Sequence, residues 1–206
     1  MNPLNGGFSQ KRRSKMSVFH PYIVAMFNEI HIAPETANMV FFWKPQPKRY
    51  GQVDEACCCQ WWLEDFTFEG VTFRSAEHAM MYGKAKMFGD ADIMRQVLLE
   101  PKPSEVKKLG RKVKNFSDPI WNEKSYALVL EINKAKFTQS PRLKKWLMAQ
   151  PDNTVFVEAS PFDELWGIKR ANDGKLNLHD IQTWKGYNKL GFAITQAFQE
   201  LKINAA

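Results

Sequence analysis

The segment from Ser75 to Phe88 constrains the fold most, because it predicts an amphipathic helix that carries charges beside its apolar face. Ser75 is a favoured residue just before a helix, and the alanines, methionines and lysines behind it are compatible with helix. At about 100° per residue, four small or apolar side chains share one face: Ala76, Met80, Gly83 and Met87.

A second stripe beside this face contains two charged residues, Glu77 and Lys84. They lie within about 20° of each other around the helix and about 10 Å apart along its axis. That separation is too long for an (i, i+4) ion pair and suits two groups that act at opposite ends of a bound ligand. Taken alone, the pattern favours a half-buried helix with two boundary charges, since a first-turn carboxylate also stabilises a helix N-terminus.

The rest of the chain predicts an α+β fold that is mainly α-helical. Short β-prone runs lie at 40–43, 60–63, 66–68, 71–73 and 154–157, with a turn at Glu69-Gly70 that favours a small antiparallel sheet. Helical patterns occupy 90–99, 104–109, 119–136, 141–148 and 188–201, and Ser160 to Asp163 resembles another helix start. The predicted domain spans residues 39–204.

Residues 1–38 are predicted to form an N-terminal extension that is partly mobile. Within it, the apolar segment 18–32 predicts a helix packed on the domain. The basic cluster Lys11–Lys15 is a weak nuclear or polyanion-binding signal, and a solvated tail is the commoner role of such a cluster.

Charge and cysteine usage narrow the class of protein. The formal net charge of +7 favours an anionic partner such as nucleic acid or a nucleotide diphosphate. The sequence has neither an 18-residue apolar run nor a secretory signal pattern, so we expect no membrane partner. The only cysteines, Cys57 to Cys59, are consecutive, which fits neither a zinc site nor disulfides. We therefore predict an intracellular, cytoplasmic protein, with a nuclear location as the alternative, and infer no obligate protein partner.

Familiar catalytic motifs are missing from the sequence. The four histidines are dispersed, and neither a Walker A loop, a dinucleotide glycine motif nor a Gly-x-Ser-x-Gly nucleophile motif occurs. Carboxylates, lysines and aromatic residues remain, and these suit glycosidic-bond chemistry. A carboxylate stabilises the cationic sugar, and a lysine or carboxylic acid protonates the leaving base. Alternatively, a lysine amine condenses with the sugar C1 as a Schiff base.

The segment from Glu77 to Asp90 resembles the Glu-His-x5-Lys-Ala signature of the NADAR family. The resemblance extends, in the family's order, over about residues 41–201. Its further matches lie at 109–113, 115–116, Trp121, 136–137, 158–168 and 184–191.

Membership of this family would imply a largely helical α+β fold without a metal or other cofactor, and cleavage of an N-glycosidic bond. One branch acts on phosphorylated riboflavin intermediates, and another removes ADP-ribose from guanine bases. The leading prediction is a hydrolase that removes ADP-ribose from guanine in DNA or RNA. The alternatives are an N-glycosidase of riboflavin intermediates and a non-catalytic ADP-ribose-binding module.

The resemblance also implies residue roles. Glu77 would be the catalytic carboxylate, and Lys84 would form a Schiff base with an opened ribose. Asp163 would complete the catalytic set and, with Trp166, hold the ribose and base. Further substrate-binding residues would be Trp62, Trp121, Gly167 and Asn188, with Arg111 and Lys112 at a diphosphate.

Each of these residues also has a structural alternative. Asp163 fits the third position of a capping box, the tryptophans fit a core, and Asn188 fits a turn. Arg111 and Lys112 fit a solvated basic face. The chain departs from the family pattern at Cys59-Gln60, at Lys169 and at Ala197-Phe198, which bears on substrate preference.

Overall fold

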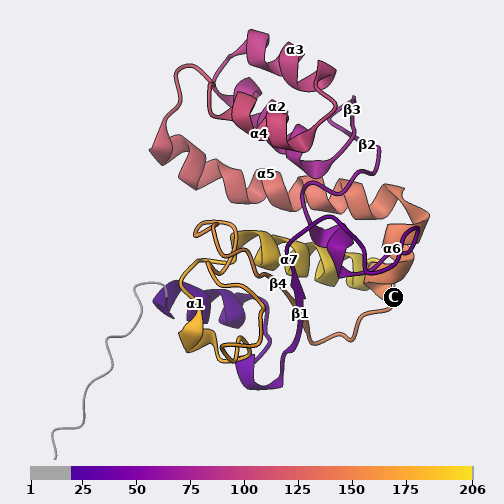
Figure 1. Cartoon of the computed structure of the whole chain (residues 1–206), viewed down its shortest axis with the longest axis vertical. Helices are drawn as coiled ribbons and strands as arrows, with labels where there is room; N and C mark the ends of the chain where they lie inside the picture. The colour runs from indigo at the N-terminus through magenta and orange to yellow at the C-terminus, as the bar shows by residue number, and fades with distance from the viewer. Residues whose placement is uncertain (1–19, 206) are drawn as a thin grey trace, which may run out of the picture.

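The computed structural model describes residues 20–205 and has an α+β fold that is mainly helical (Figure 1). The helices are α1 (His20–Glu29), α2 (Ala76–Met87), α3 (Ala91–Leu99), α4 (Pro103–Gly110), α5 (Asp118–Gln139), α6 (Pro141–Met148) and α7 (Lys189–Ile203). The short 3-10 helices are η1 (Pro34–Thr36), η2 (Glu55–Cys58) and η3 (Ile181–Thr183), and the strands are β1 (Asn38–Phe42), β2 (Phe66–Phe68), β3 (Val71–Phe73) and β4 (Thr154–Glu158). The basic cluster Lys11–Lys15 lies outside the described residues.

Four strands form two separate pairs in the described chain. The predicted antiparallel hairpin is confirmed, because β2 pairs with β3 around Glu69 and Gly70, both of which have positive φ. The second pair was not predicted: β1 and β4 run parallel, with Asn38 opposite Thr154 and Phe42 opposite Glu158. Local sequence patterns do not predict a pairing between segments so far apart in the chain. The β-prone run at 60–63 forms a turn rather than a strand.

Two apolar clusters build the core. In Figure 1, α5 runs across the molecule with α2, α3 and α4 on one side and α7 on the other. The second cluster joins α1 to β4 and α7 through residues such as Phe27, Val155 and Phe192. The predicted helix within 18–32 is therefore confirmed and packs on the domain. The domain boundary at residue 38 stays a prediction.

Helix α2 sits close to its neighbours because two glycines remove side chains from the contacts. A Cβ on Gly83 would lie 2.8 Å from a methyl of Leu128 in α5, and one on Gly110 would lie 1.9 Å from the sulfur of Met81. Ser75 begins the helix as predicted, because its hydroxyl accepts a hydrogen bond from the His78 N–H. This packing fixes the direction in which the Glu77 and Lys84 stripe faces.

Two predicted helix starts differ from the structure. Helix α4 begins at Pro103 rather than after Ser104, because proline fits the first turn of a helix. No helix follows Ser160, although its hydroxyl accepts hydrogen bonds from the backbone of Phe162 and Asp163. These bonds close a turn instead. Along residues 20–205, no helix combines the length and apolarity that crossing a bilayer requires.

Candidate active site

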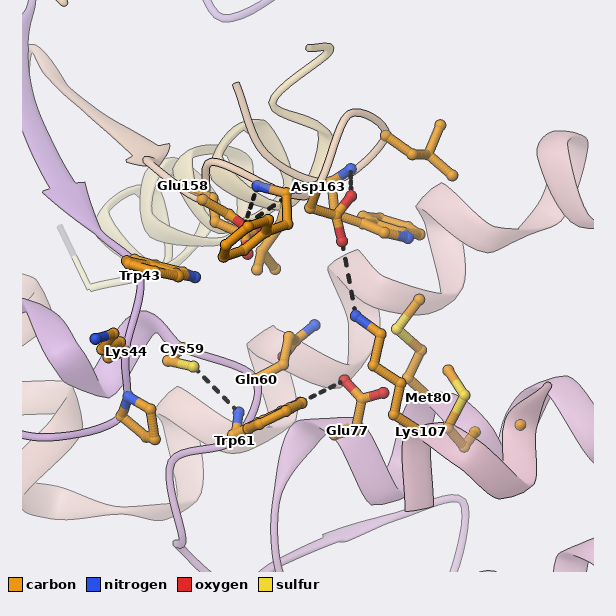
Figure 2. Close-up of a pocket in the computed structure, with 18 of the residues that line it drawn as sticks. Trp43, Lys44, Cys59, Gln60, Trp61, Glu77, Met80, Lys107, Glu158 and Asp163 are labelled. Carbon is orange, nitrogen blue, oxygen red and sulfur yellow. Dashed lines mark hydrogen bonds and ion pairs between the residues drawn. The ribbon is translucent and has the colours of Figure 1, made fainter. Parts of the chain in front are cut away.

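A cavity of about 980 Å³ opens where the ends of β1 and β4 meet α2, α4 and the turn after η2 (Figure 2). Its wall combines carboxylates, cations and aromatic rings. The charged side chains are Glu77, Glu158, Asp163, Glu164, Lys44, Lys84, Lys107 and Arg111. The aromatic side chains are Trp43, Trp61, Trp121, Phe162 and Trp166. The structure thus brings six of the predicted residues together: Glu77, Lys84, Asp163, Trp121, Trp166 and Arg111.

Glu77 is the predicted carboxylate, and it is only 5% exposed. The indole N–H of Trp61 donates to its Oε2 at 3.2 Å, and the Glu77 backbone N–H donates to the Gln60 carbonyl at 2.9 Å. Burial raises the pKa of Glu77 to about 7, against the opposing effects of Lys107 and the Trp61 hydrogen bond. A carboxyl that titrates near neutral pH can give or take a proton there.

A buried lysine holds the turn that carries Gln60 and Trp61. Lys136 of α5 donates to the carbonyls of Cys57 and Cys59 at 2.6 and 3.1 Å. Its ammonium is fully buried, and burial lowers its pKa. Because hydrogen bonds that involve a charged group are strong, Lys136 fixes the backbone on which the Trp61 contact with Glu77 depends.

Asp163 lies on the opposite wall from Glu77, in the loop after β4 (Figure 2). Its Oδ1 accepts the Trp166 backbone N–H at 2.8 Å. The capping-box alternative for Asp163 is wrong, because no helix follows Ser160. The Asp163 Oδ2 lies 3.8 Å from the Lys107 ammonium. Lys107 was not predicted, yet among the charged side chains it has the largest effect on the pKa of Glu77, which it lowers. Its position on α4 offered no signal, since exposed lysines are common on helices.

Lys84 lines the cavity beside two aromatic rings. Its Nζ lies 4.0 Å from the ring centroid of Phe116 and 5.4 Å from that of Trp121. Burial lowers the pKa of this amine, and Asp118 partly opposes the shift. A lowered pKa increases the fraction of neutral amine, which is the nucleophilic form.

Glu158 is a carboxyl that the sequence prediction missed. It is the last residue of β4, and its Oε2 is buried without a hydrogen-bond partner among residues 20–205. Burial is the main reason that its pKa rises to about 8, with a smaller contribution from Asp163. Gln60 is similar: it is 7% exposed, and both polar atoms of its amide lack partners within the described chain. Leaving such a group unpaired costs about 1–3 kcal/mol.

Four predicted binding residues do not line this cavity. Trp62 is buried in the core, and its indole N–H donates to Glu64. Lys112 is exposed and borders a separate depression near Asp90. Asn188 and Gly167 contact the backbone of Glu158 in the cavity wall. The resemblance to the NADAR family singled out all four residues, but it does not distinguish a residue that contacts substrate from one that supports the cavity wall.

Asn188 acts on the end of β4. Its Oδ1 accepts the Glu158 N–H at 2.9 Å, and its Nδ2 donates to the Phe156 carbonyl at 3.0 Å. Gly167 packs against the same strand, since a Cβ there would lie 2.8 Å from the Glu158 carbonyl oxygen. Both residues therefore hold the backbone of Glu158 in place.

Comparison with known protein families supplies the context for this cavity. The model of the NADAR domain matches residues 41–202, which include every residue that lines the cavity. This chain belongs to the NADAR family. Within the described part of the chain, no three or more His, Cys, Asp or Glu side chains gather as metal ligands.

Individual relatives agree with that assignment. N-glycosidase R617 of Acanthamoeba polyphaga mimivirus is 36% identical over 132 residues, 64% of this chain and 76% of that protein. Protein irg-1 of Caenorhabditis elegans is 33% identical over 64% of this chain and 62% of its own length. The chloroplastic riboflavin biosynthesis protein PYRR of Zea mays is 31% identical over 40% of this chain and 14% of its own.

A solved structure shows the same fold. The NMR structure of the Escherichia coli protein YbiA superposes with a TM-score of 0.63, at 20% identity, and covers 81% of this chain and 86% of that one. The predicted α+β, mainly helical NADAR fold is therefore confirmed.

Proposed function

We propose that this NADAR protein is an N-glycosidase that removes ADP-ribose from guanine bases of DNA or RNA. Family membership and the relative named N-glycosidase support N-glycosidase activity in general. One observation carries the proposal: the buried Glu77 carboxyl, held by Trp61, faces a cavity with aromatic walls and with cations from α4.

The chemistry follows from the positions of Glu77 and Lys84. Breaking the bond requires a charge to stabilise the cationic sugar and a proton for the departing base. Glu77 titrates near neutral pH and can serve as the acid–base group. The Lys84 amine, whose pKa is lowered, attacks C1 of the ribose; the C1–N bond breaks, and the base leaves with a proton from the Glu77 carboxyl. Of the two amine protons, one returns to Glu77 and the other goes to O4′ as the C1–O4′ bond opens, which leaves a Schiff base. Water then hydrolyses the Schiff base, which releases ADP-ribose and restores the amine. Asp163 and Trp166 hold the sugar.

The cations at the cavity suit a diphosphate. Lys107 and Arg111 line it from α4 and its C-terminal end, and the chain carries a net charge of +7. Arg111 is exposed, so it is free to approach a phosphate. The volume of about 980 Å³ lies at the upper end of the range for small-ligand sites, which suits a ligand as long as ADP-ribose.

The test is incubation with a guanine oligonucleotide that carries ADP-ribose, followed by mass spectrometry. We expect release of free ADP-ribose and of the unmodified oligonucleotide by the wild type and not by Glu77→Gln. The matched control is Glu131→Gln, which changes an exposed carboxyl on α5 that lies outside the cavity and pairs with Lys134. Equal inertness of the wild type and Glu77→Gln would refute the proposal.

The maize relative favours a second candidate, an N-glycosidase of phosphorylated riboflavin intermediates. Phosphoribosyl-pyrimidine substrates in the same assay distinguish the two activities. A non-catalytic ADP-ribose-binding module would instead bind ADP-ribose in calorimetry without any turnover.

A further inference from the structure

The cavity contains polar groups that the proposed chemistry does not use. Glu158 and Gln60 both line the cavity, and polar atoms of both are buried without partners among residues 20–205. Figure 2 shows the Gln60 amide directed into the space between Trp61 and the wall formed by Glu158 and Asp163. An unpaired donor and unpaired acceptors that face the same space indicate a ligand with complementary groups.

An aromatic face adjoins these two residues because of the strand pairing. Phe42 lies opposite Glu158 in the parallel β1–β4 pair, and the Ala159 N–H donates to the Phe42 carbonyl at 2.8 Å. Trp43, the next residue, is therefore held beside the end of β4. Its ring is half-buried and lines the cavity, 5.9 Å from the ring of Phe162.

We propose that Trp43, Gln60 and Glu158 form the base subsite of the cavity and recognise the Watson–Crick edge of guanine. The base stacks on Trp43. Glu158 releases its proton to solvent as guanine binds, and the resulting carboxylate accepts the N1–H and a 2-amino N–H, while the Gln60 amide N–H donates to O6. This assignment deepens the proposed function, on which it rests for the identity of the base.

The rigidity of this wall supports a role in specificity. Asn188 and Gly167 hold the Glu158 backbone, and the Gln60 carbonyl accepts the Glu77 N–H. Lys136 fixes the preceding residue, Cys59. A site built to hydrogen-bond a substrate rejects an analogue that lacks the matching group, because its buried polar atoms then stay unpaired.

The experiment measures binding rather than turnover, so it is independent of hydrolysis. GMP, IMP and AMP are titrated calorimetrically into the full-length wild type, Glu158→Gln, Gln60→Leu and the control Glu131→Gln, which changes an exposed carboxyl outside the cavity. IMP lacks only the 2-amino group of GMP. We expect the wild type and Glu131→Gln to bind GMP about tenfold more tightly than IMP, and AMP more weakly still.

The variants separate the two contacts. Glu158→Gln should reduce the GMP-to-IMP ratio to about one, and Gln60→Leu should weaken GMP and IMP equally, about fivefold, without affecting AMP. Thermal melting shows whether each variant is folded, and Glu158→Gln keeps the shape of the side chain. Equal binding of GMP and IMP by the wild type, a preference that survives Glu158→Gln, or no nucleotide binding would overturn the inference. A subsite that binds GMP without any release of ADP-ribose would refute the proposed function alone.

Discussion

Two buried carboxyls face the same cavity from different elements, and their surroundings differ. Glu77 projects from the first turn of α2 and accepts a hydrogen bond from Trp61. Glu158 ends β4, and its buried Oε2 has no partner in the described chain. Burial raises the pKa of both, to about 7 and about 8. A hydrogen bond to the charged form favours ionisation of Glu77, whereas Glu158 is left for a ligand to satisfy.

The proposed mechanism places the proton transfer at Glu77, so removal of that carboxyl should have the largest effect. Glu77→Gln keeps the size of the side chain but can neither give nor take a proton. We expect kcat for ADP-ribosyl-guanine hydrolysis to fall by about 10²–10⁴-fold, measured by product release. A fall of less than tenfold would assign the acid–base role to another group.

Lys84 lies on the same helix as Glu77 and is proposed to form the covalent intermediate. Borohydride added during turnover should trap a covalent substrate adduct on the wild type, detectable by mass spectrometry, and none on Lys84→Ala. Lys86 points to another side of α2 and pairs with Glu69, so Lys86→Ala is the matched control. Absence of an adduct on the wild type would limit Lys84 to an acid or electrostatic role.

The pH dependence of the free energy of unfolding tests whether burial raises the pKa of Glu158. A carboxyl with a raised folded pKa stabilises the fold below its unfolded pKa of about 4.3, and this stability is lost as pH rises through the folded value. The wild type should therefore lose stability from pH 5 to pH 8.5. Glu158→Gln should lose less, by about 1.4 kcal/mol for each unit of pKa shift removed.

Urea unfolding at several pH values measures that difference, with Glu131→Gln as the control that should behave as the wild type does. Parallel pH profiles for the wild type and Glu158→Gln would show that Glu158 is not held protonated in the folded protein.

The smallest expected effect concerns the Trp61 hydrogen bond. Trp61→Phe removes a donor to the ionised form of Glu77, so the pKa of Glu77 should rise further. Because Glu77 is proposed to protonate the departing base, its pKa sets the alkaline limb of the kcat profile, and this limb should move up by at most about one unit. Activity at pH 7 should be kept, and activity above pH 7 should rise by at most about tenfold. An unmoved limb would show that Trp61 only packs against its neighbours.

The same two regions show what the sequence can predict. The α2 stripe was predictable because helical periodicity and the Ser75 cap are local signals. Glu158 and Trp43 were not, because their meeting depends on the parallel pairing of β1 with β4. Gln60 was not either, because its turn is held by Lys136 from a distant part of the chain. The resemblance marked Asn188, but only the structure shows that its amide supports β4.

One experiment tests most directly whether Glu77 transfers the proton and Glu158 recognises the base. Hydrolysis of ADP-ribosylated guanine oligonucleotide and the GMP-to-IMP affinity ratio are measured side by side for the wild type, Glu77→Gln and Glu158→Gln. The account predicts that Glu77→Gln loses hydrolysis but keeps a ratio of about ten, and that Glu158→Gln reduces the ratio to about one. Glu77→Gln lowering the ratio as far as Glu158→Gln does, or keeping full hydrolysis, would contradict it.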